Sequence, residues 1–507
     1  MADMDDECDS ASAMSTTRRF KDPIHDYIPL APEVCAVVDT KHFQRLRNIK
    51  QLGTSYYVWP GASHNRFEHC LGVAHLARLM TEHLQKSQPE LDITDRDVRC
   101  VMLAGLCHDL GHGPWSHVWD SMFIPRALSV PAPARKKWKH EDASEMMFDD
   151  MIRQYDLGIS EQDATFIKAL IAGDKTRCAD TLEKPFLFEI VANKRNGIDV
   201  DKFDYIARDS NAIGERGNLS LSRLIDSSRV VDNEICFDIK DANQVYELCY
   251  TRFSLHKRIY HHKTGTYPTK AIEFMIIDAL LAADPYMKIA ECIEQPSEYI
   301  SLTDDIMPFI ERTKDPELAE SRAIFARIRE RDLYKCVDYK VFEWGMHDLL
   351  QAEVTAAAIV REAKRLDAAA AAARAAQSKD IAALQARDVI VSLSQMHHGM
   401  GEDNPLDSVK FYSKRNLDRS QHAGRGDLSI LMPASFGEVL LRVYTKDTRY
   451  FGIVQAGYRS IMQQLRDRAA AAAAALVADS VPPSPMIAAT ELELPLTPST
   501  PPPPPPP

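Results

Sequence analysis

The stretch CHDLGHGPWSH, Cys107–His117, places three histidines and one aspartate within eleven residues. Two glycines and a proline interrupt it. Buried imidazoles and carboxylates need partners, so a cluster of this density without a ligand would be costly. Imidazole and carboxylate together suit zinc, iron, manganese or nickel better than calcium. We therefore interpret His108 and Asp109 as ligands of a transition metal and not as part of a solvated surface.

The residues before this stretch follow a helical pattern. Thr94, with Asp97 three residues later, is typical of a capping box, in which two side chains satisfy the first free N–H groups of a helix. Apolar residues then recur at helical spacing, at Val98, Val101, Met102 and Leu106. We expect this helix to end near Leu110, with Gly111 as its stop. His112 would then lie one turn beyond His108 on the same face.

The composition excludes several classes of protein. The chain has 507 residues, 45% of them hydrophobic and 26% charged, and a formal net charge of −12. That charge argues against broad affinity for DNA, RNA or acidic membranes. The acidic start lacks the apolar core of a secretory signal, and no run reaches the ~20 apolar residues that span a bilayer. The ten cysteines include no CxxC pair, which favours an intracellular protein of the nucleus or cytoplasm.

Composition also divides the chain into segments. We expect a disordered acidic N-terminus at 1–19, a helix-rich domain at 20–300, a second lobe at 301–465 and a disordered Ala/Pro-rich tail at 466–507. An alanine-rich charged helix near 355–385, inside the second lobe, is expected to face solvent. The tail contains Thr497 followed by proline, which is either a site of proline-directed phosphorylation or a chance pair.

Helices dominate the expected structure. TKAIEFMIIDALLAADP predicts a helix that Pro285 stops, and DPELAESRAIFARIRERD predicts another. Strand signals are few, and the best candidates are GTSYYVWPG at 53–61 and SVKFYSK at 408–414. The sequence therefore predicts a mainly α protein with a minor sheet component.

Two further segments could complete a metal site, because two ligands alone do not make one. SHNRFEHCLGVAHLARLM contributes His64, Arg66, His69 and His75 near an expected helix start. NGIDVDKFDYIARDS contributes Asp199, Asp201, Asp204 and Asp209. Taken singly, a histidine such as His75 is more often structural, and an acidic run is more often a solvated face or a cap. These readings stay open on spacing alone.

A resemblance connects the three segments. His69, the pair His108 and Asp109, and Asp201 match the H…HD…D pattern of HD-domain metal phosphohydrolases. Over FQRLRNIKQLG, YYVWPGASHNRFEH, AGLCHDLGHGPWSH and NKRNGIDVDKFDY the chain resembles eukaryotic sterile-alpha-motif/HD-domain deoxynucleoside triphosphate triphosphohydrolases. The resemblance runs from about Asp22 to Lys446 and is looser in the second half. It implies an HD-domain helical core as the catalytic domain, followed by a smaller mixed α/β lobe for regulation and oligomerisation. We expect no sterile-alpha-motif domain before residue 20.

The resemblance also implies a reaction. A deoxynucleoside triphosphate and water would give the deoxynucleoside and inorganic triphosphate. His69, His108, Asp109 and Asp201 would hold one transition metal (zinc, iron or manganese), and magnesium would bridge the nucleotide phosphates. His117 would be the general acid for the leaving 5′-oxygen, since an imidazole titrates near neutral pH. Asp120, His112 and His140 would support that acid or contact phosphate.

Substrate residues are implied in the same way. The triphosphate would meet Arg66, Lys202 and Arg252, and the sugar would meet Gln51, Tyr205 and Asp209. Leu52 and Tyr260 would crowd the 2′ carbon and so exclude ribonucleotides. In TRFSLHKRIYHHKTG, one helix face would carry Arg252, His256, Tyr260 and Lys263, which without the resemblance reads as a solvated basic helix. His261 replaces a glutamine of the family, so the base preference is open.

Activation by nucleotides is implied as well, with GTP or dGTP and a second deoxynucleotide driving dimers into a homotetramer. The first, guanine-reading pocket would use Arg18, Asp39, Gln44 and Arg47. The second would use Val58, Arg223, Lys240, Arg258 and Lys263. Trp59, Lys21 and Asp238 depart from the family there, and Asp238 reverses a charge, so we predict weaker or altered activation by deoxynucleotides.

Two other functions remain as alternatives. The chain could be another HD-domain nucleotide phosphohydrolase or phosphodiesterase, which the products would distinguish. It could instead be a nucleotide sensor or a weak binder of single-stranded nucleic acid, although the acidic net charge of −12 disfavours general nucleic-acid affinity.

Overall fold

The structure is a computed structural model that describes residues 17–128, 138–178, 184–215, 219–260, 269–374, 379–424 and 431–479. Helices make up most of it. Their bounds are α1 Pro32–Val38, α2 Lys41–Gln44, α3 Arg66–Ser87, α4 Asp95–Cys107, α5 Ile124–Ala127, α6 His140–Gln154, α7 Glu161–Ala172, α8 Phe188–Val191, α9 Val200–Ala212, α10 Leu221–Asp226, α11 Ala242–Leu255, α12 Thr269–Met287, α13 Pro296–Tyr299, α14 Ile306–Arg312, α15 Ala319–Arg329, α16 His347–Glu353, α17 Ala356–Arg374, α18 Lys379–Ala383 and α19 Phe451–Asp479.

Short single turns and nine strands complete the described elements. The turns are η1 Arg45–Asn48, η2 Ser55–Tyr57, η3 Pro89–Leu91, η4 Trp119–Phe123, η5 Lys175–Arg177, η7 Pro185–Leu187, η8 Ile239–Asp241, η9 His256–Tyr260, η10 Ile289–Glu294, η11 Pro316–Leu318, η12 Trp344–Met346, η13 Ala386–Asp388, η14 Pro405–Ser408 and η15 Thr448–Tyr450. The strands are β1 Arg18–Asp22, β2 Asp26–Leu30, β3 Ser228–Val231, β4 Glu234–Asp238, β5 Lys335–Glu343, β6 Val389–His397, β7 Lys410–Ser413, β8 Asn416–His422 and β9 Gly437–Thr445.

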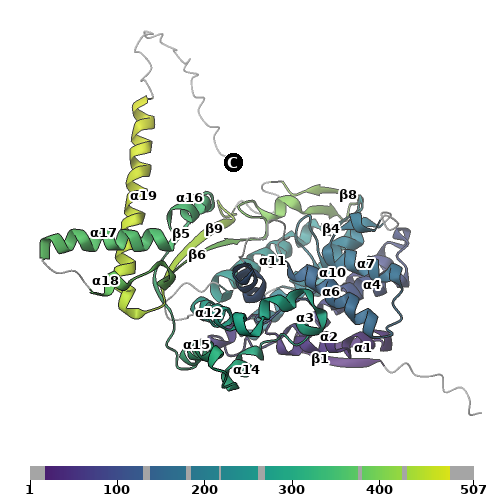
Figure 1. The fold of residues 1–507 in the computed structure, drawn as a ribbon. Coiled ribbons are helices and arrows are strands. Elements are labelled where there is room, and N and C mark those ends of the chain that lie inside the picture. Colours follow the sequence, from purple (N-terminus) through teal and green to yellow (C-terminus); the bar gives the residue numbers. More distant parts are fainter. Residues whose placement is uncertain are drawn as a thin grey trace, which may run out of the picture.

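The strands form three small sheets around the helices. β1 and β2 make an antiparallel hairpin, and β3, β4, β7 and β8 make a four-stranded sheet in which β4 and β7 run parallel. β9 lies between β5 and β6 in the third sheet, antiparallel to both. Figure 1 shows this third sheet with α16, α17 and α19 at one side of the molecule, next to the larger helical body. The predicted fold class, a helical core with a smaller mixed α/β C-terminal region, is therefore confirmed.

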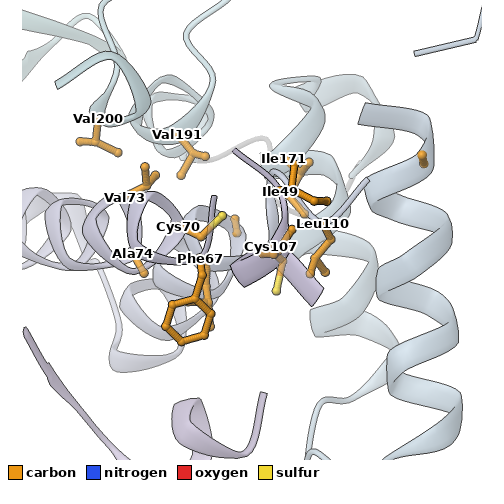
Figure 2. Close-up of a cluster of buried hydrophobic side chains, with 14 of the residues drawn as sticks. Ile49, Phe67, Cys70, Val73, Ala74, Cys107, Leu110, Ile171, Val191 and Val200 are labelled. Atoms are coloured by element: carbon orange, nitrogen blue, oxygen red, sulfur yellow. The ribbon is translucent and has the colours of Figure 1, made fainter. Parts of the chain in front are cut away.

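Helix α3 lies at the centre of the larger body and positions the site. Glu68 accepts a hydrogen bond from the Asn65 backbone N–H at 2.8 Å, which caps the start of the helix. Buried side chains along α3, among them Cys70 and Val73, pack with residues of α4, α8 and α9 (Figure 2). Because three of the expected site segments lie on or beside these helices, the core fixes their relative positions.

Three local expectations were wrong. The helix after Thr94 is capped as predicted, with Asp97 N–H donating to Thr94 Oγ1 at 3.2 Å, but α4 ends at Cys107 and not near Leu110. The stretch 53–61 is no strand, because successive turns, such as Trp59 N–H to Ser55 O at 2.8 Å, satisfy its backbone. Pro285 lies inside α12, which continues to Met287.

The second predicted strand, SVKFYSK, is confirmed as β7. The alanine-rich helix is less exposed than expected, because Ile359 and Ala363 of α17 are buried against α19. Helix α19 also runs to Asp479, beyond residue 466, where we expected order to end. The nine described cysteines are free. Among the described helices, none combines the length and the apolar composition that a bilayer span requires.

Candidate active site

Four side chains from three helical segments meet beside α3. His69 lies on α3, Asp201 on the first turn of α9, and His108 and Asp109 directly after α4. His69 Nε2 is 3.1 Å from Asp201 Oδ1 and 3.6 Å from Asp109 Oδ2, and His108 Nε2 is 3.4 Å from both Asp109 Oδ1 and Asp201 Oδ1. The structure therefore brings together the four residues that we expected to bind metal.

The orientation of both imidazoles fits a metal site. His69 Nδ1 is 2.8 Å from Asp204 Oδ2, and His108 Nδ1 is 2.8 Å from the Gly105 carbonyl oxygen. These acceptors hold a proton on each Nδ1, so both Nε2 atoms face the carboxylates and would present their lone pairs to a metal ion that displaces the competing proton. His108 Nε2 is buried, and no described residue meets it in hydrogen-bond geometry. The donor set of two imidazoles and two carboxylates suits a transition ion.

The electrostatics of these four groups are tightly linked. Burial opposes a charge on His69, but hydrogen bonds to Asp201 and Asp204 outweigh it and raise the pKa of His69 to about 10. The pKa of Asp109 is held well below its usual range because the charges of Arg66 and His108 outweigh its burial. Protons and a metal ion compete for the same ligand atoms, so occupancy by metal would fall with falling pH.

A second group of histidines surrounds Asp120. His140 Nδ1 is 2.8 Å and His117 Nδ1 is 3.3 Å from the same Asp120 oxygen, Oδ2. The His112 and His140 rings stack with centroids 4.0 Å apart. His112 Nε2 is 3.2 Å from Asp109 Oδ1, which joins this group to the first. Burial opposes the charge on His140, but Asp120 raises its pKa. Burial and the charge of Arg66 hold the pKa of His112 well below its usual value.

The loop that carries His117 is strained and firmly held. Trp115 and Ser116 have φ angles of 53° and 56°, in the left-handed region that non-glycine residues rarely adopt. Asp304 Oδ1 accepts the Trp115 N–H at 2.6 Å, and Asp304 Oδ2 accepts the Lys50 N–H at 2.9 Å. Burial raises the pKa of Asp304 to about 7 despite these bonds. The loop is thereby tied to the segment just before Gln51.

The glycines of this stretch serve close approach and do not stop a helix, which corrects the role expected for Gly111. A Cβ atom on Gly111 would lie 2.2 Å from the His140 carbonyl oxygen. On Gly113 it would lie 2.5 Å from the Trp119 ring. Arg45 donates to the carbonyl oxygens of Leu110 and His112, both at 2.9 Å, and so holds the turn between them.

A cavity of about 450 Å³ opens beside both groups. Its lining includes twelve of the expected site residues: Gln51, Leu52, Arg66, Asp109, His112, His117, His140, Asp201, Tyr205, Asp209, Arg252 and His256. It also includes residues that the sequence did not single out, Gly53, Ser55, Trp115, Ser116, Val118, Ser121, Met122, Lys270 and Glu273. The arrangement places carboxylates, imidazoles and cations around one space large enough for a small organic anion.

The expected phosphate-binding cations differ in their surroundings. Arg66 pairs with Asp109 and donates to Ser116 Oγ at 2.9 Å. Arg252 lines the cavity and donates to the His397 carbonyl oxygen at 2.9 Å. Lys202 lies 3.2 Å from both oxygens of Asp199 and is not among the residues that line the cavity. Two of the three expected cations therefore face the space in which a phosphate would fit.

The residues expected to bind the sugar border the cavity. Gln51, Leu52, Tyr205 and Asp209 all line the cavity, and Asp209 Oδ1 is 2.7 Å from His64 Nε2. Arg252 belongs to α11, which ends at Leu255, and His256 opens the π-turn η9. The predicted continuous helix face is therefore interrupted. The side chain of Tyr260 and the residues His261 and Lys263 lie outside the described residues.

The four residues of the first expected activator pocket are neighbours. Arg18 donates to both oxygens of Asp39, at 2.7 and 2.8 Å. Gln44 donates to the Val38 carbonyl oxygen at 2.7 Å, and Arg47 donates to Gln44 Oε1 at 2.8 Å. The carboxylate expected to read guanine is thus engaged by an arginine of the same chain.

The residues of the second expected pocket have separate partners. Arg223 pairs with Asp241, and Arg258 pairs with Glu215 at 2.7 Å. The backbone N–H of Lys240 donates to Asp238 Oδ1 at 3.1 Å, so Asp238 caps the turn η8. Val58 ends the turn η2. Lys21 pairs with Asp26 in the hairpin.

Sequence reasoning missed the residues that support the ligands. Asp204 was noted only as one of four aspartates, although its spacing from Asp201 places both on α9. His25 bonds to Asp204 across 179 residues, and Asp304 reaches the His117 loop across 189. No local pattern signals contacts of that separation.

The chain is similar in sequence to a known protein family and to several known proteins. Residues 66–171 match the family model described as HD domain. The chain is 42% identical over 461 residues to "Deoxynucleoside triphosphate triphosphohydrolase SAMHD1" of Danio rerio, with 85% of this chain and 71% of that protein covered. The human protein of that name is 42% identical over 465 residues, with 85% and 71% covered. The homolog of Dictyostelium discoideum is 36% identical over 462 residues, with 89% and 82% covered. The similarity therefore extends well beyond the HD segment.

Proposed function

Because this chain belongs to the SAMHD1 family of deoxynucleoside triphosphate triphosphohydrolases, we propose that it hydrolyses a deoxynucleoside triphosphate to the deoxynucleoside and inorganic triphosphate. One observation carries the proposal. The two imidazoles and two carboxylates beside α3 adjoin, through Asp109, the histidine group around Asp120, and both groups border one cavity. A metal-ligand set and an acid–base set thus share one space.

The first set would hold a transition metal through His69, His108, Asp109 and Asp201. Such an ion supplies Lewis acidity, which acidifies water and polarises a phosphoryl oxygen. Arg66 and Arg252 offset the charge of the triphosphate, which is about −4, and the further negative charge that develops toward the leaving 5′-oxygen would be met by the proton of the general acid. A magnesium ion bridging the phosphates would add to this neutralisation.

His117 is the proposed general acid for the 5′-oxygen. Its side chain is 68% exposed, so it can reach a substrate in the cavity, while Asp120 is buried. The carboxylate of Asp120 fixes the ring through Nδ1 and leaves Nε2 free to deliver a proton. His140 shares the same oxygen of Asp120, which keeps that carboxylate ionised and oriented.

Leu52 supports discrimination against ribonucleotides. It lines the cavity directly beside Gln51, whose buried Oε1 has no hydrogen-bond partner among the described residues. A 3′-hydroxyl could donate to that oxygen, while a 2′-hydroxyl would meet the leucine side chain. Excluding the wrong sugar by an apolar contact leaves its hydroxyl without a partner, which is costly.

Regulation by nucleotides is part of the proposal. A guanine nucleotide binding at Asp39 would displace Arg18, which then becomes free to meet a phosphate. The proposed outcome is assembly of dimers into a homotetramer, with a weaker response to deoxynucleotides because Asp238 places a negative charge at the second pocket. Titrating GTP and each dNTP while following the oligomeric state tests this, and equal dependence on both nucleotides would contradict it.

Chromatography of dGTP and GTP mixtures, incubated with the purified protein with and without a chelator, tests the activity itself. We expect deoxyguanosine from dGTP, no guanosine from GTP, and no product after chelation. His108→Ala should abolish the reaction, whereas His83→Ala, a matched change on α3 whose ring bonds to the Ser228 carbonyl oxygen, should leave it intact. Release of dGMP would favour the alternative of a different nucleotide phosphohydrolase.

A further inference from the structure

The carboxylate of Asp204 contacts three side chains, two of which come from distant parts of the chain. Its Oδ2 accepts from His69 Nδ1 at 2.8 Å, and its Oδ1 lies 2.6 Å from His25 Nε2. Arg208 binds both oxygens, at 2.8 and 2.9 Å. The side chains of His25, His69, Asp204 and Arg208 are all at most 6% exposed. The carboxylate is therefore fixed in its plane as well as in its position.

His25 is itself held by the turn of the β1–β2 hairpin. Asp22 Oδ1 accepts the backbone N–H groups of Ile24 and His25, at 2.8 and 2.9 Å. Its other oxygen, Oδ2, accepts from Arg208 at 2.7 Å. Asp22 thus binds the hairpin turn to the same arginine that binds Asp204. The turn and the α9 helix form one closed network of buried charged hydrogen bonds.

The consequence concerns His69. Its Nδ1–H has to point at Asp204 for Nε2 to present a lone pair to a metal. Each Asp204 oxygen bears one imidazole and one guanidinium nitrogen, so loss of His25 frees one side of the carboxylate. Asp204 can then rotate toward Arg208, and the Nδ1 bond of His69 weakens.

We propose that His25 is a positioning residue for the metal site, acting through Asp204 on the imidazole of His69. This inference rests on the metal site of the proposed function. It assigns the N-terminal hairpin, which lies outside the HD segment at 66–171, a part in metal binding. Arg18, of the first activator pocket, lies at the other end of the same strand, β1, as Asp22.

A purely structural role for His25 predicts something different. Ile28 and Leu30 of β2 are buried in the main core, so a damaged hairpin would lower the free energy of unfolding. The metal affinity of the molecules that remain folded would then be unchanged. Metal affinity and stability therefore separate the two roles.

The test compares His25→Phe, His25→Gln and the control His83→Phe in the full-length metal-free protein. Phenylalanine keeps a ring against His75, whose centroid is 5.4 Å away, but cannot donate. Glutamine keeps a donor. Affinity for Mn²⁺ is measured by competition with a chromophoric chelator, and the geometry is read from the visible absorption of the Co²⁺-loaded protein. Circular dichroism of the metal-free proteins checks that each is folded.

We expect His25→Phe to weaken Mn²⁺ binding about 10- to 100-fold, the usual effect of losing a partner of a metal-binding histidine, and to alter the Co²⁺ spectrum. His25→Gln and His83→Phe should stay within about threefold of the wild type. Wild-type affinity in His25→Phe, or an equal loss in all three variants, would overturn the proposal. If His25→Phe does not fold, His25→Asn, whose amide is too short to reach Asp204, replaces it. A wild-type protein that binds metal but leaves dGTP intact would refute the proposed function and not this inference.

Discussion

Gly72 lies directly against Asp204: a Cβ atom on Gly72 would be 1.9 Å from Asp204 Oδ1. The same atom would be 2.6 Å from Nη2 of Arg208. Helices α3 and α9 therefore touch at this point with no side chain from α3 between them. This close approach lets the Asp204 carboxylate reach His69, which lies on α3 three residues before Gly72.

Gly72→Ala should consequently disturb the metal site through Asp204, the hydrogen-bond partner of His69. The methyl group must displace Asp204, so we expect a loss of about 2 kcal/mol in the free energy of unfolding and about tenfold weaker metal binding. Chemical denaturation and chelator competition measure the two effects. Gly345→Ala is the control, because its Cβ would meet no atom within 4 Å. Equal behaviour of the two variants would contradict the account.

Asp120→Asn should reduce turnover more than substrate binding. Both His117 and His140 use Asp120 Oδ2, and an amide cannot serve them as a carboxylate does. We expect kcat to fall about 100-fold with KM changed by less than about threefold, as measured by steady-state kinetics with dGTP. Glu141→Gln is the matched control, because its carboxylate lies 3.5 Å from the same His140 nitrogen and is 38% exposed. A similar loss in the control would contradict a special role for Asp120.

Asp304 should make stability depend on pH. In the unfolded chain its carboxyl loses its proton near pH 4, whereas in the folded protein burial raises its pKa to about 7. The folded state therefore binds more protons between these values, so the free energy of unfolding should fall as pH rises from about 4 to about 7 and change no further above that. Each unit of difference between the folded and unfolded pKa values corresponds to about 1.4 kcal/mol. Because the Asp304 side chain is partly exposed, the effect is smaller, and we expect the free energy of unfolding to fall by about 2 kcal/mol.

Denaturation of Asp304→Asn across that pH range isolates the effect, because asparagine does not titrate. The free energy of unfolding of the wild type minus that of the variant should decrease steadily from pH 4 to pH 7. Asp305→Asn, at the exposed neighbouring position, controls for the local change of charge. A difference that does not vary with pH would show that the Asp304 carboxyl titrates normally.

Leu52→Ala should relax the choice of sugar. Removing the leucine side chain from the cavity wall leaves room for a 2′-hydroxyl and a water molecule, so the ratio of GTP to dGTP hydrolysis should rise at least about tenfold. Val118→Ala removes apolar volume from another part of the lining and should leave the ratio unchanged. Product chromatography measures both. An unchanged ratio in Leu52→Ala would show that other residues exclude ribonucleotides.

Local patterns were sufficient to predict the helical fold class and the start of α4. Apolar periodicity and the Thr94–Asp97 capping box both arise from neighbouring residues, and the structure has both. The strand wrongly predicted at 53–61 shows the limit of local patterns. An aromatic run flanked by glycines is compatible with a strand and equally with consecutive turns. Tertiary contacts decided between them.

The candidate site could likewise be predicted only in part. His69, His108, Asp109 and Asp201 could be grouped through a known family pattern, and the structure brings them together. The support of that group could not be predicted, because it depends on bonds such as His25 to Asp204 that join residues 179 positions apart. The engagement of Asp39 by Arg18 was likewise invisible, since each residue alone matched a binding role.

The most direct test of the central claim is phosphorus NMR of the dGTP products formed in ¹⁸O-labelled water by the manganese-loaded protein. Attack of water on the α-phosphorus with loss of the 5′-oxygen predicts tripolyphosphate with one ¹⁸O on a terminal phosphorus, together with unlabelled deoxyguanosine. Formation of dGMP with pyrophosphate, label in the deoxyguanosine, or undiminished turnover in His108→Ala would contradict the account.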